Sequence, residues 1–262
     1  MSDAPQLFSD GAAYEQRMGR WSRLVGEIFL DWLAAPPGLR WLDVGCGNGA
    51  FTEVLIARCA PGAVSAVDPS EGQLAYARAR QSTSLAEFRL GDAQALPYAD
   101  RSFDAAAMAL AISFIPDPLR AAREMTRVVK PGGLVATYMW DLPAGGIPVE
   151  PMYRALHSLG VPAQMPGMEV SRREGMQSVW TQAGLQSVET RVIRIQVSFA
   201  DFDEFWLSYK VPEGPAGLAL RKMSPPEVER LKVRLRELLP TVADGRIAYE
   251  CFANAVKGRA PN

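Results

Sequence analysis

A glycine-rich turn between an apolar run and a helix places the strongest constraint on what this chain folds into. The apolar run is Trp41-Leu-Asp-Val44, the turn is Gly45-Cys-Gly-Asn-Gly49, and a helix is expected from Ala50 to about Cys59. Glycines let the backbone turn sharply and let a ligand approach it closely, and the helix start offers positive N–H groups. Strand, glycine turn and helix in this order predict the opening of a βαβ unit.

The same alternation of apolar runs and helical patterns continues to residue 141. The expected strands are Ala63–Val67, Ala86–Leu90, Phe103–Ile112 and, after the turn Pro131-Gly-Gly133, Leu134–Trp140; the expected helices are Glu71–Arg80 and Asp117–Val129. Strands separated by helices of this length predict a parallel sheet with helices on both faces. The expected fold class is therefore α/β, with a doubly wound, Rossmann-like sheet.

The pattern changes on both sides of this region. An amphipathic helix is expected at Arg17–Leu33, and a helix near Glu174–Ala183 precedes two alternating segments, Val188–Val197 and Arg246–Val256. Between these, residues 142–170 are rich in Pro, Gly and Met, and residues 200–245 have a helical pattern with an aromatic cluster. We expect a single domain over residues 1–262, with a cofactor-binding core at 36–141, an N-terminal lid helix in 1–35, and cap insertions at 142–170 and 200–245.

Composition excludes several classes of protein. The formal net charge of −1 argues against a nucleic-acid binder, which needs a basic footprint. Cys46, Cys59 and Cys251 lie too far apart for a zinc pattern or a disulfide framework, which favours a reducing compartment. No apolar run approaches the roughly 18 residues that a membrane span needs. We expect a soluble, cytoplasmic protein without a metal, a nucleic-acid partner or a membrane partner; the oligomeric state stays open.

Three carboxylates lie at the carboxyl ends of the first three expected strands of the core. Asp43 lies two residues before the first glycine, Asp68 follows the second strand, and Asp92 follows the third. All three belong to the carboxyl ends of parallel strands, where an open α/β sheet binds its ligand. The spacing Gly45-x-Gly47-x-x-Ala50 followed by Asp68 also satisfies a dinucleotide fingerprint, so the glycines alone leave a nicotinamide-dependent oxidoreductase open.

The charges of the three acids favour one ligand over the other. A dinucleotide brings a negative pyrophosphate, which Asp43 would repel at close range. S-adenosyl-L-methionine brings an ammonium, a sulfonium and one carboxylate, so its net charge is positive near neutral pH. The acids therefore predict S-adenosyl-L-methionine as the cofactor.

Five segments together resemble a known family. LDVGCGNG, VDPSEGQL, GDAQALPY, FDAAAMALAISFIPDP and REMTRVVKPGGLVATYMW are similar, in order and spacing, to motifs of type 11 class I methyltransferases, which are related to ubiquinone and menaquinone biosynthesis. The resemblance covers residues 14–141. It implies a seven-stranded, mostly parallel sheet with an antiparallel last strand, and transfer of a methyl group to an O, N or C nucleophile of a small, partly hydrophobic molecule.

The resemblance also implies which residues line the cofactor. Asp43 and the backbone of Gly45 are expected to hold the methionine ammonium, with Cys46 and Gly47 lining the cofactor beside them. Ala109 and Leu110 are expected beneath the methionine arm, and Tyr14 and Arg20 are expected to close over it.

Other residues are expected at the nucleoside end of the cofactor. Asp68 is expected to accept both ribose hydroxyls, while Pro69 and Gln73 pack beside the adenine; Gln73 replaces a Met that is frequent in the family. Asp92 and the N–H of Ala93 are expected at the adenine edge.

The sequence offers only weak candidates for a catalytic base. Ser113 stands where many relatives carry His, so a relative's acid–base residue is not preserved. His157, the only histidine, is a candidate general base in the cap insertion, with a surface or structural role as its alternative. Asp141 is a second candidate at the mouth of the cleft, with a capping role as its alternative. A protein that keeps the cofactor pocket but has lost its chemistry is the non-enzyme hypothesis.

Overall fold

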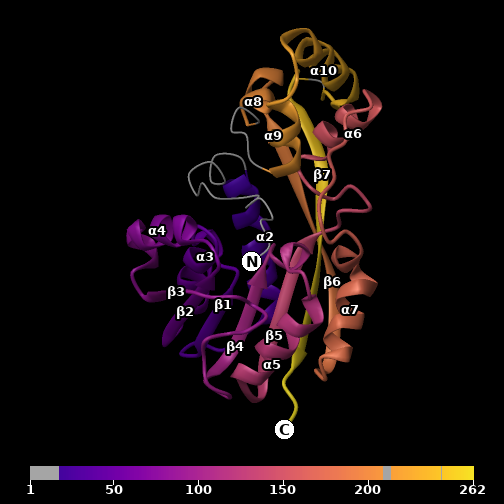
Figure 1. Ribbon diagram of the computed structural model, residues 1–262. Coiled ribbons are helices and arrows are strands. Elements are labelled where there is room, and N and C mark those ends of the chain that lie inside the picture. Colours follow the sequence, from indigo (N-terminus) through magenta and orange to yellow (C-terminus); the bar gives the residue numbers. More distant parts are fainter. Residues whose placement is uncertain (1–17, 209–213, 243) are drawn as a thin grey trace.

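Seven strands form one sheet in the computed structural model, which describes residues 18–208, 214–242 and 244–262 (Figure 1). The sheet order is β3-β2-β1-β4-β5-β7-β6. The strands are β1 (Arg40–Val44), β2 (Ala63–Asp68), β3 (Ala86–Leu90), β4 (Phe103–Ala109), β5 (Val129–Trp140), β6 (Gln186–Phe199) and β7 (Ile247–Arg259). Strands β1 to β5 pair in parallel, and β7 is antiparallel to both of its neighbours. The predicted fold class is confirmed.

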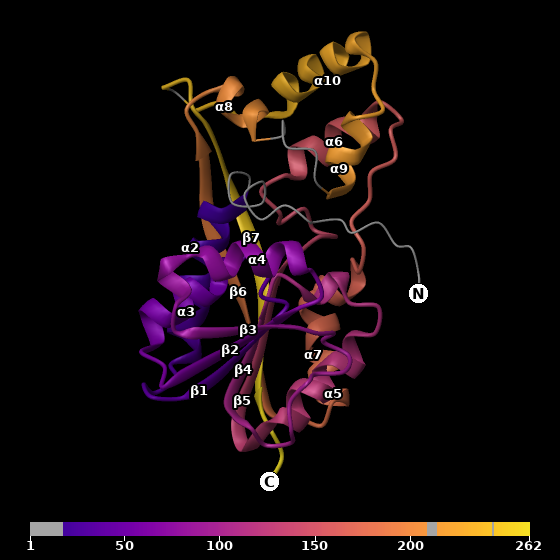
Figure 2. The same ribbon diagram turned by 60° about the vertical axis from the view of Figure 1, so that its left-hand side comes forward.

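Helices cover both faces of this sheet. The core helices are α2 (Arg20–Leu33), α3 (Ala50–Cys59), α4 (Glu71–Ala79), α5 (Pro118–Val128) and α7 (Arg173–Gln182). Figure 2 shows α2 and α3 on one face and α5 and α7 on the other. Short 3-10 turns η2 (Gln81–Thr83), η3 (Ile112–Phe114) and η4 (Glu169–Ser171) complete the connections.

Helix α2 packs as part of the core; the expected lid helix in residues 1–35 includes residues 1–17, which lie outside the described residues, and stays a prediction. Val25 and Phe29 are completely buried, and the Phe29 ring lies 4.7 Å from the ring of Tyr138 on β5. The wide apolar stripe of this helix is buried by packing on the sheet and on α3, so α2 is not free to close over a ligand. Tyr14 lies outside the described residues.

Two strand boundaries differ from the sequence prediction for backbone reasons. Strand β4 ends at Ala109 because Leu110 has φ +56°, which turns the chain into η3 three residues before the predicted end. Strand β5 begins at Val129, so the Pro131-Gly-Gly133 segment is an irregularity inside the strand and not a turn before it. The register of β4 with β5 shifts at this point, and Gly132 has φ +72°.

Four further helices lie together beyond the carboxyl ends of the parallel strands (Figure 1). They are α6 (Glu150–Ser158), α8 (Phe202–Leu207), α9 (Gly214–Leu220) and α10 (Pro225–Leu238). Helices α8 to α10 connect β6 to β7, and α6 packs against α9 and α10. Phe205, Leu231 and Leu235 are completely buried, and they belong to the same continuous apolar core as the sheet.

The described helices are all short in comparison with a membrane span. The longest, α2 and α10, have 14 residues each. Within the described ranges no helix combines the length and the apolar character that crossing a bilayer requires.

Candidate functional site

The glycine turn lies across the ends of β1 and β2. Gly45, Gly47 and Gly49 all have positive φ values, of +70°, +51° and +80°. A Cβ atom at Gly45 would lie 2.6 Å from the Cβ of Ala111, so no side chain fits there. The N–H groups of Gly45 and Cys46 both donate to the carbonyl oxygen of Val67 on β2. Backbone therefore forms the surface of this turn, as a closely approaching ligand requires.

Asp68 ends β2 and holds the glycine turn from the other side. Its Oδ2 accepts the N–H of Gly47 at 2.9 Å, and its Oδ1 accepts the N–H of Ser70 at 2.9 Å. Burial raises the pKa of Asp68, and these two hydrogen bonds oppose the shift. Because a carboxylate has about four acceptor positions, each oxygen keeps capacity for one ligand hydroxyl.

Asp43 on β1 is completely buried beside the turn. Its Oδ2 accepts the hydroxyl of Thr52 at 2.6 Å, while its Oδ1 has no hydrogen-bond donor among the residues that the structure describes. Burial raises the pKa of Asp43 to about 7; the Thr52 hydrogen bond opposes this shift and the charge of Asp68 adds to it. An orphaned carboxylate oxygen of this kind fits a ligand that brings an ammonium group.

Asp92 follows β3 and lies next to the same cluster. The N–H of Gly91 donates to the Asp68 carbonyl at 3.1 Å. The exposed Asp92 carboxylate accepts the backbone N–H of Gln94 at 2.8 Å and the side-chain amide of Gln94 at 3.2 Å from each oxygen. Sequence reasoning missed Gln94 and Thr52, because neither belongs to a glycine or acid motif.

The match to known proteins concerns this part of the chain. Residues 42–137 match the family described as "Methyltransferase domain". Over these residues the chain is similar to a methyltransferase domain. The domain contains the glycine turn and the three carboxylates described above.

A curated relative supports the same assignment. The demethylmenaquinone methyltransferase of Renibacterium salmoninarum is 37% identical over 144 residues, which are 55% of this chain and 57% of that protein. The chain spans about half the length of the curated relatives it matches.

Solved structures share the fold over most of the chain. One is a protein of Bacillus halodurans C-125, provisionally described as a methyltransferase, with TM-score 0.60, 16% identity, and coverage of 90% of this chain and 99% of that one. Another is phosphoethanolamine N-methyltransferase 2 of Haemonchus contortus in complex with S-adenosyl-L-methionine, with TM-score 0.60, 20% identity, and coverage of 96% and 56%.

The methyltransferase domain brings most of the predicted cofactor residues together. Cys46 is buried against Ala66 and Leu74, and burial raises the pKa of its thiol, which keeps it neutral. Gln73 is buried close to Gly47, whereas Pro69 is exposed.

The expected residues beneath the methionine arm also lie in this region. Ala109 ends β4, and Leu110 donates its N–H to the carbonyl of Tyr138. The chain then leads to Ala111, which lies against the glycine turn.

Arg20 makes its contacts away from the glycine turn. Its guanidinium lies 3.0 Å from Glu204 on α8, donates to the carbonyl of Ser198 at 3.1 Å, and covers the rings of Trp21 and Phe199. None of these partners belongs to the glycine turn, so the expected contact between Arg20 and the methionine arm stays a prediction.

The two candidate bases are engaged in local structure. His157 is exposed on α6, and its Nε2 lies 2.6 Å from the carbonyl oxygen of Ala163. Asp141 accepts the N–H of Ala144 at 3.1 Å and the side-chain amide of Asn254 at 2.8 Å, as a turn residue does. These contacts favour the structural alternative for both side chains.

A cleft of about 1540 Å³ separates the methyltransferase domain from the helices beyond it. Its lining comes from η3, the start of α5, residues 161–172, α9 and the start of α10, and the apolar members include Phe114, Ile115, Met165, Met168, Leu218 and Met223. Ser113 is one of its lining residues, at 2% exposure. The Ser113 hydroxyl donates to the carbonyl of Gly167 at 3.2 Å, which fastens the 161–172 segment over the end of β4.

Proposed function

We propose that the chain is an S-adenosyl-L-methionine-dependent methyltransferase whose acceptor is a small, partly hydrophobic molecule with an O, N or C nucleophile. The observation that carries the proposal is the completely buried carboxylate of Asp43, with one oxygen that lacks a donor among the described residues. A cationic ligand group offsets the desolvation of such a carboxylate. A dinucleotide pyrophosphate would increase the unfavourable charge instead.

The residues of the glycine turn fit the cofactor's groups. Asp43 would accept the ammonium, Asp68 would accept the ribose hydroxyls, and Asp92 would accept the adenine amino group. When bound, S-adenosyl-L-methionine supplies a methyl group already activated by the sulfonium charge. This chain's own residues then need to position the acceptor and keep water away from it.

The cleft supports an acceptor with a substantial apolar part. Its lining is rich in Met and Pro side chains, and ligand sites are mainly apolar with few polar groups. Among the described lining residues, Arg172 is paired with Glu169 at 3.0 Å and Glu227 closes the capping box of α10 with Ser224. These three charges are therefore committed to the protein's own structure, and Lys222 is the further charged residue of the lining.

Positioning carries more of the proposed catalysis than a general base does. Ser113 is bound to Gly167 and His157 to Ala163, so neither hydroxyl nor imidazole is poised over an open acceptor position. A positioned base contributes about 10²–10⁴-fold, whereas fixing two reactants together supplies an effective molarity of about 10⁵ M or more. An acceptor that is already a nucleophile can react on positioning alone.

Two measurements test the proposal. Calorimetry with S-adenosyl-L-methionine, S-adenosylhomocysteine and NAD should give micromolar binding of the first two and no response to NAD. Transfer of a labelled methyl group from S-adenosyl-L-methionine to a panel of phenols, amines and quinols should then give a product. Tight NAD binding without a response to the sulfonium ligand would overturn the proposal. Cofactor binding without transfer to any acceptor would favour the inactive binding protein.

A further inference from the structure

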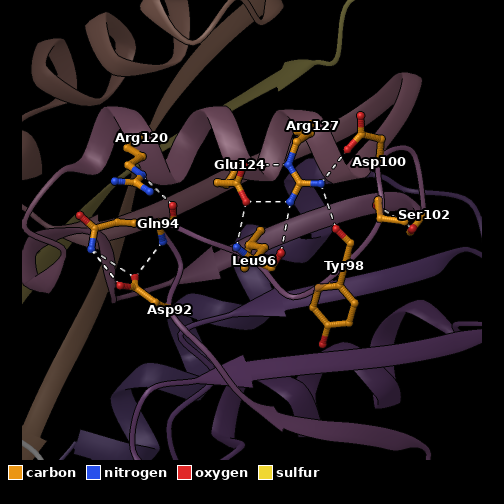
Figure 3. Close-up of polar contacts among 10 residues, drawn as sticks. Asp92, Gln94, Leu96, Tyr98, Asp100, Ser102, Arg120, Glu124 and Arg127 are labelled. Atoms are coloured by element: carbon orange, nitrogen blue, oxygen red, sulfur yellow. Dashed lines mark hydrogen bonds and ion pairs between the residues drawn. The ribbon is translucent and has the colours of Figure 1, made fainter.

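Helix α5 forms a row of hydrogen bonds and ion pairs with the loop that connects β3 to β4. In this connection residues 91–102 contain no helix, and their backbone runs along one face of α5 (Figure 3). Arg120, Glu124 and Arg127 are spaced four and three residues apart, so they share that face. Their partners are the backbone groups of residues 94, 96 and 98 and the side chain of Asp100.

The second half of the loop is fixed by an ion pair. Arg127 donates to the carbonyls of Leu96 at 3.2 Å and Tyr98 at 2.9 Å and pairs with Asp100 at 2.7 Å. Glu124 pairs with Arg127 and accepts the N–H of Leu96 at 2.9 Å. These contacts anchor the loop without touching Asp92.

The first half of the loop is fixed through Gln94, which three groups hold. Its backbone carbonyl accepts Nε of Arg120 at 2.8 Å, and its side-chain Oε1 accepts the N–H of Asp117 at 3.1 Å. Its Nε2 then faces both oxygens of Asp92 at 3.2 Å. Because Oε1 is occupied by a backbone donor, the amide cannot flip without losing both contacts.

We infer that Gln94 is a positioning residue that fixes the carboxylate of Asp92 for recognition of the purine 6-position. The inference rests on the proposed function, in which Asp92 meets the adenine edge. Asp92 is exposed, and the backbone N–H of Gln94 holds its Oδ1, whereas the printed contact of its Oδ2 comes from the Gln94 amide alone. Without that amide the carboxylate would be free to rotate about the remaining bond. The start of α5 holds Gln94, and Gln94 in turn restricts the Asp92 carboxylate. A helix of the core thereby affects which purine the proposed cofactor site prefers.

The purine 6-position makes this role measurable. Adenine carries an amino group there, which donates to a carboxylate. Hypoxanthine carries a carbonyl oxygen, which a carboxylate repels. A fixed Asp92 carboxylate therefore discriminates between S-adenosylhomocysteine and S-inosylhomocysteine, and a mobile one discriminates less.

The experiment measures the ratio of the two affinities by calorimetry on the full chain. The parent protein is expected to prefer S-adenosylhomocysteine by about tenfold or more, the range for a hydrogen bond to a charged group. Gln94→Glu keeps the acceptor for the Asp117 N–H but removes the amide donor, and Gln94→Met removes it without adding charge. Both variants should lower the preference by about three- to tenfold. Gln177→Glu, an exposed position on α7, adds the same charge elsewhere and should leave the ratio unchanged.

The outcomes separate the inference from the proposed function. A merely structural role for Gln94 would lower the melting temperature and both affinities together, leaving their ratio within twofold, and would overturn the inference. Equal binding of the two ligands by the parent would overturn it as well. If the parent binds neither ligand, the proposed function itself fails.

Discussion

At the scale of single residues, the carboxylates of the glycine turn have different environments although their sequence settings are alike. Asp43 is completely buried with one hydrogen bond from Thr52, whereas Asp68 accepts two backbone N–H groups and Asp92 is exposed. Burial disfavours the charged form, and hydrogen bonds to the carboxylate favour it. The ligand-free protein therefore holds an acid at Asp43 that titrates near neutral pH.

Asp43 should make the stability of the ligand-free protein depend on pH. Its pKa of about 7 in the folded chain exceeds the value of about 3.9 expected in the unfolded chain, so the folded state binds the proton more tightly. The stability that this provides is complete below about pH 4 and is lost as the pH rises through 7. Between pH 5 and pH 7 the loss is roughly 2 kcal/mol, because the slope of about 1.36 kcal/mol per pH unit falls to half as the pH reaches the folded pKa.

Urea denaturation of the parent and of Asp43→Asn across this range tests the expectation. The variant keeps an acceptor for Thr52 but cannot titrate, so its stability should fall less with rising pH. Some slope should remain, because burial also raises the pKa of Asp68. Parallel pH profiles for the two proteins would contradict the assigned role of Asp43.

Asp68→Ala should weaken both cofactor binding and the fold. Binding of S-adenosylhomocysteine should lose about 2–4 kcal/mol, because two hydrogen bonds from the ribose hydroxyls to one carboxylate disappear. Stability should fall by about 1–3 kcal/mol, because the N–H groups of Gly47 and Ser70 lose their acceptor.

Asp31→Ala is the matched control for this substitution. It removes an exposed carboxylate that pairs with Arg58. Its cost should stay within about 1 kcal/mol of stability, with no change in affinity. An affinity of Asp68→Ala within twofold of the parent would show that Asp68 does not hold the ribose.

At the scale of elements, the segment from 161 to 172 is attached to the core by a close backbone contact. Gly167 has φ +59°, and a Cβ atom there would lie 2.3 Å from the carbonyl oxygen of Ser113. Together with the Ser113 hydroxyl bond, this contact sets one wall of the cleft. A His at position 113, as the resemblance implies for many relatives, would need the space beside this glycine.

Gly167→Ala should therefore loosen this wall of the cleft. The added methyl group meets backbone and the residue keeps an unfavourable φ, so we expect a loss of about 1–3 kcal/mol in stability. Hydrogen exchange in residues 161–172 should become faster, while S-adenosylhomocysteine affinity should stay unchanged.

Gly160→Ala isolates the backbone contribution to this effect. Its φ of +72° is equally unfavourable for alanine, but nothing lies within 4 Å of the added atom. It should cost only about 1 kcal/mol. Equal losses for the two variants would mean that the contact with Ser113 adds nothing.

At the scale of the whole molecule, burial increases from the β3 edge toward the centre of the sheet. Ala105, Ala106 and Ala107 on β4 are completely buried, whereas Leu90 on β3 is 58% exposed. The centre of the sheet supports the fold, and the loops after β1, β2 and β3 carry the proposed cofactor residues.

Hydrogen exchange should follow this gradient. Amides of β4 and β5 should exchange slowest and those of β3 fastest among the parallel strands, because local opening needs less free energy where little apolar surface is buried. S-adenosylhomocysteine should slow exchange most in residues 43–49, 68–73 and 91–95. If S-adenosylhomocysteine slowed exchange equally in all strands, that result would contradict a ligand bound at the carboxyl ends of β1 to β3.

The sequence determined the elements whose signals are local. The bounds of β1, β2, β3 and α3 lie within one residue of the prediction, because apolar runs and a glycine turn specify them over a few neighbours. The three carboxylates likewise lie at strand ends, because strand alternation fixes their topological place.

Only the tertiary structure decided the features that depend on distant partners. The turn at Leu110, the irregular Pro131-Gly-Gly133 segment of β5 and the packing of α2 result from neighbouring strands and helices. The raised pKa of Asp43 needs complete burial, and the role of Gln94 needs a helix more than twenty residues away in the chain. Periodicity carries no information about such contacts, because they arise only when the folded sheet brings separate segments together.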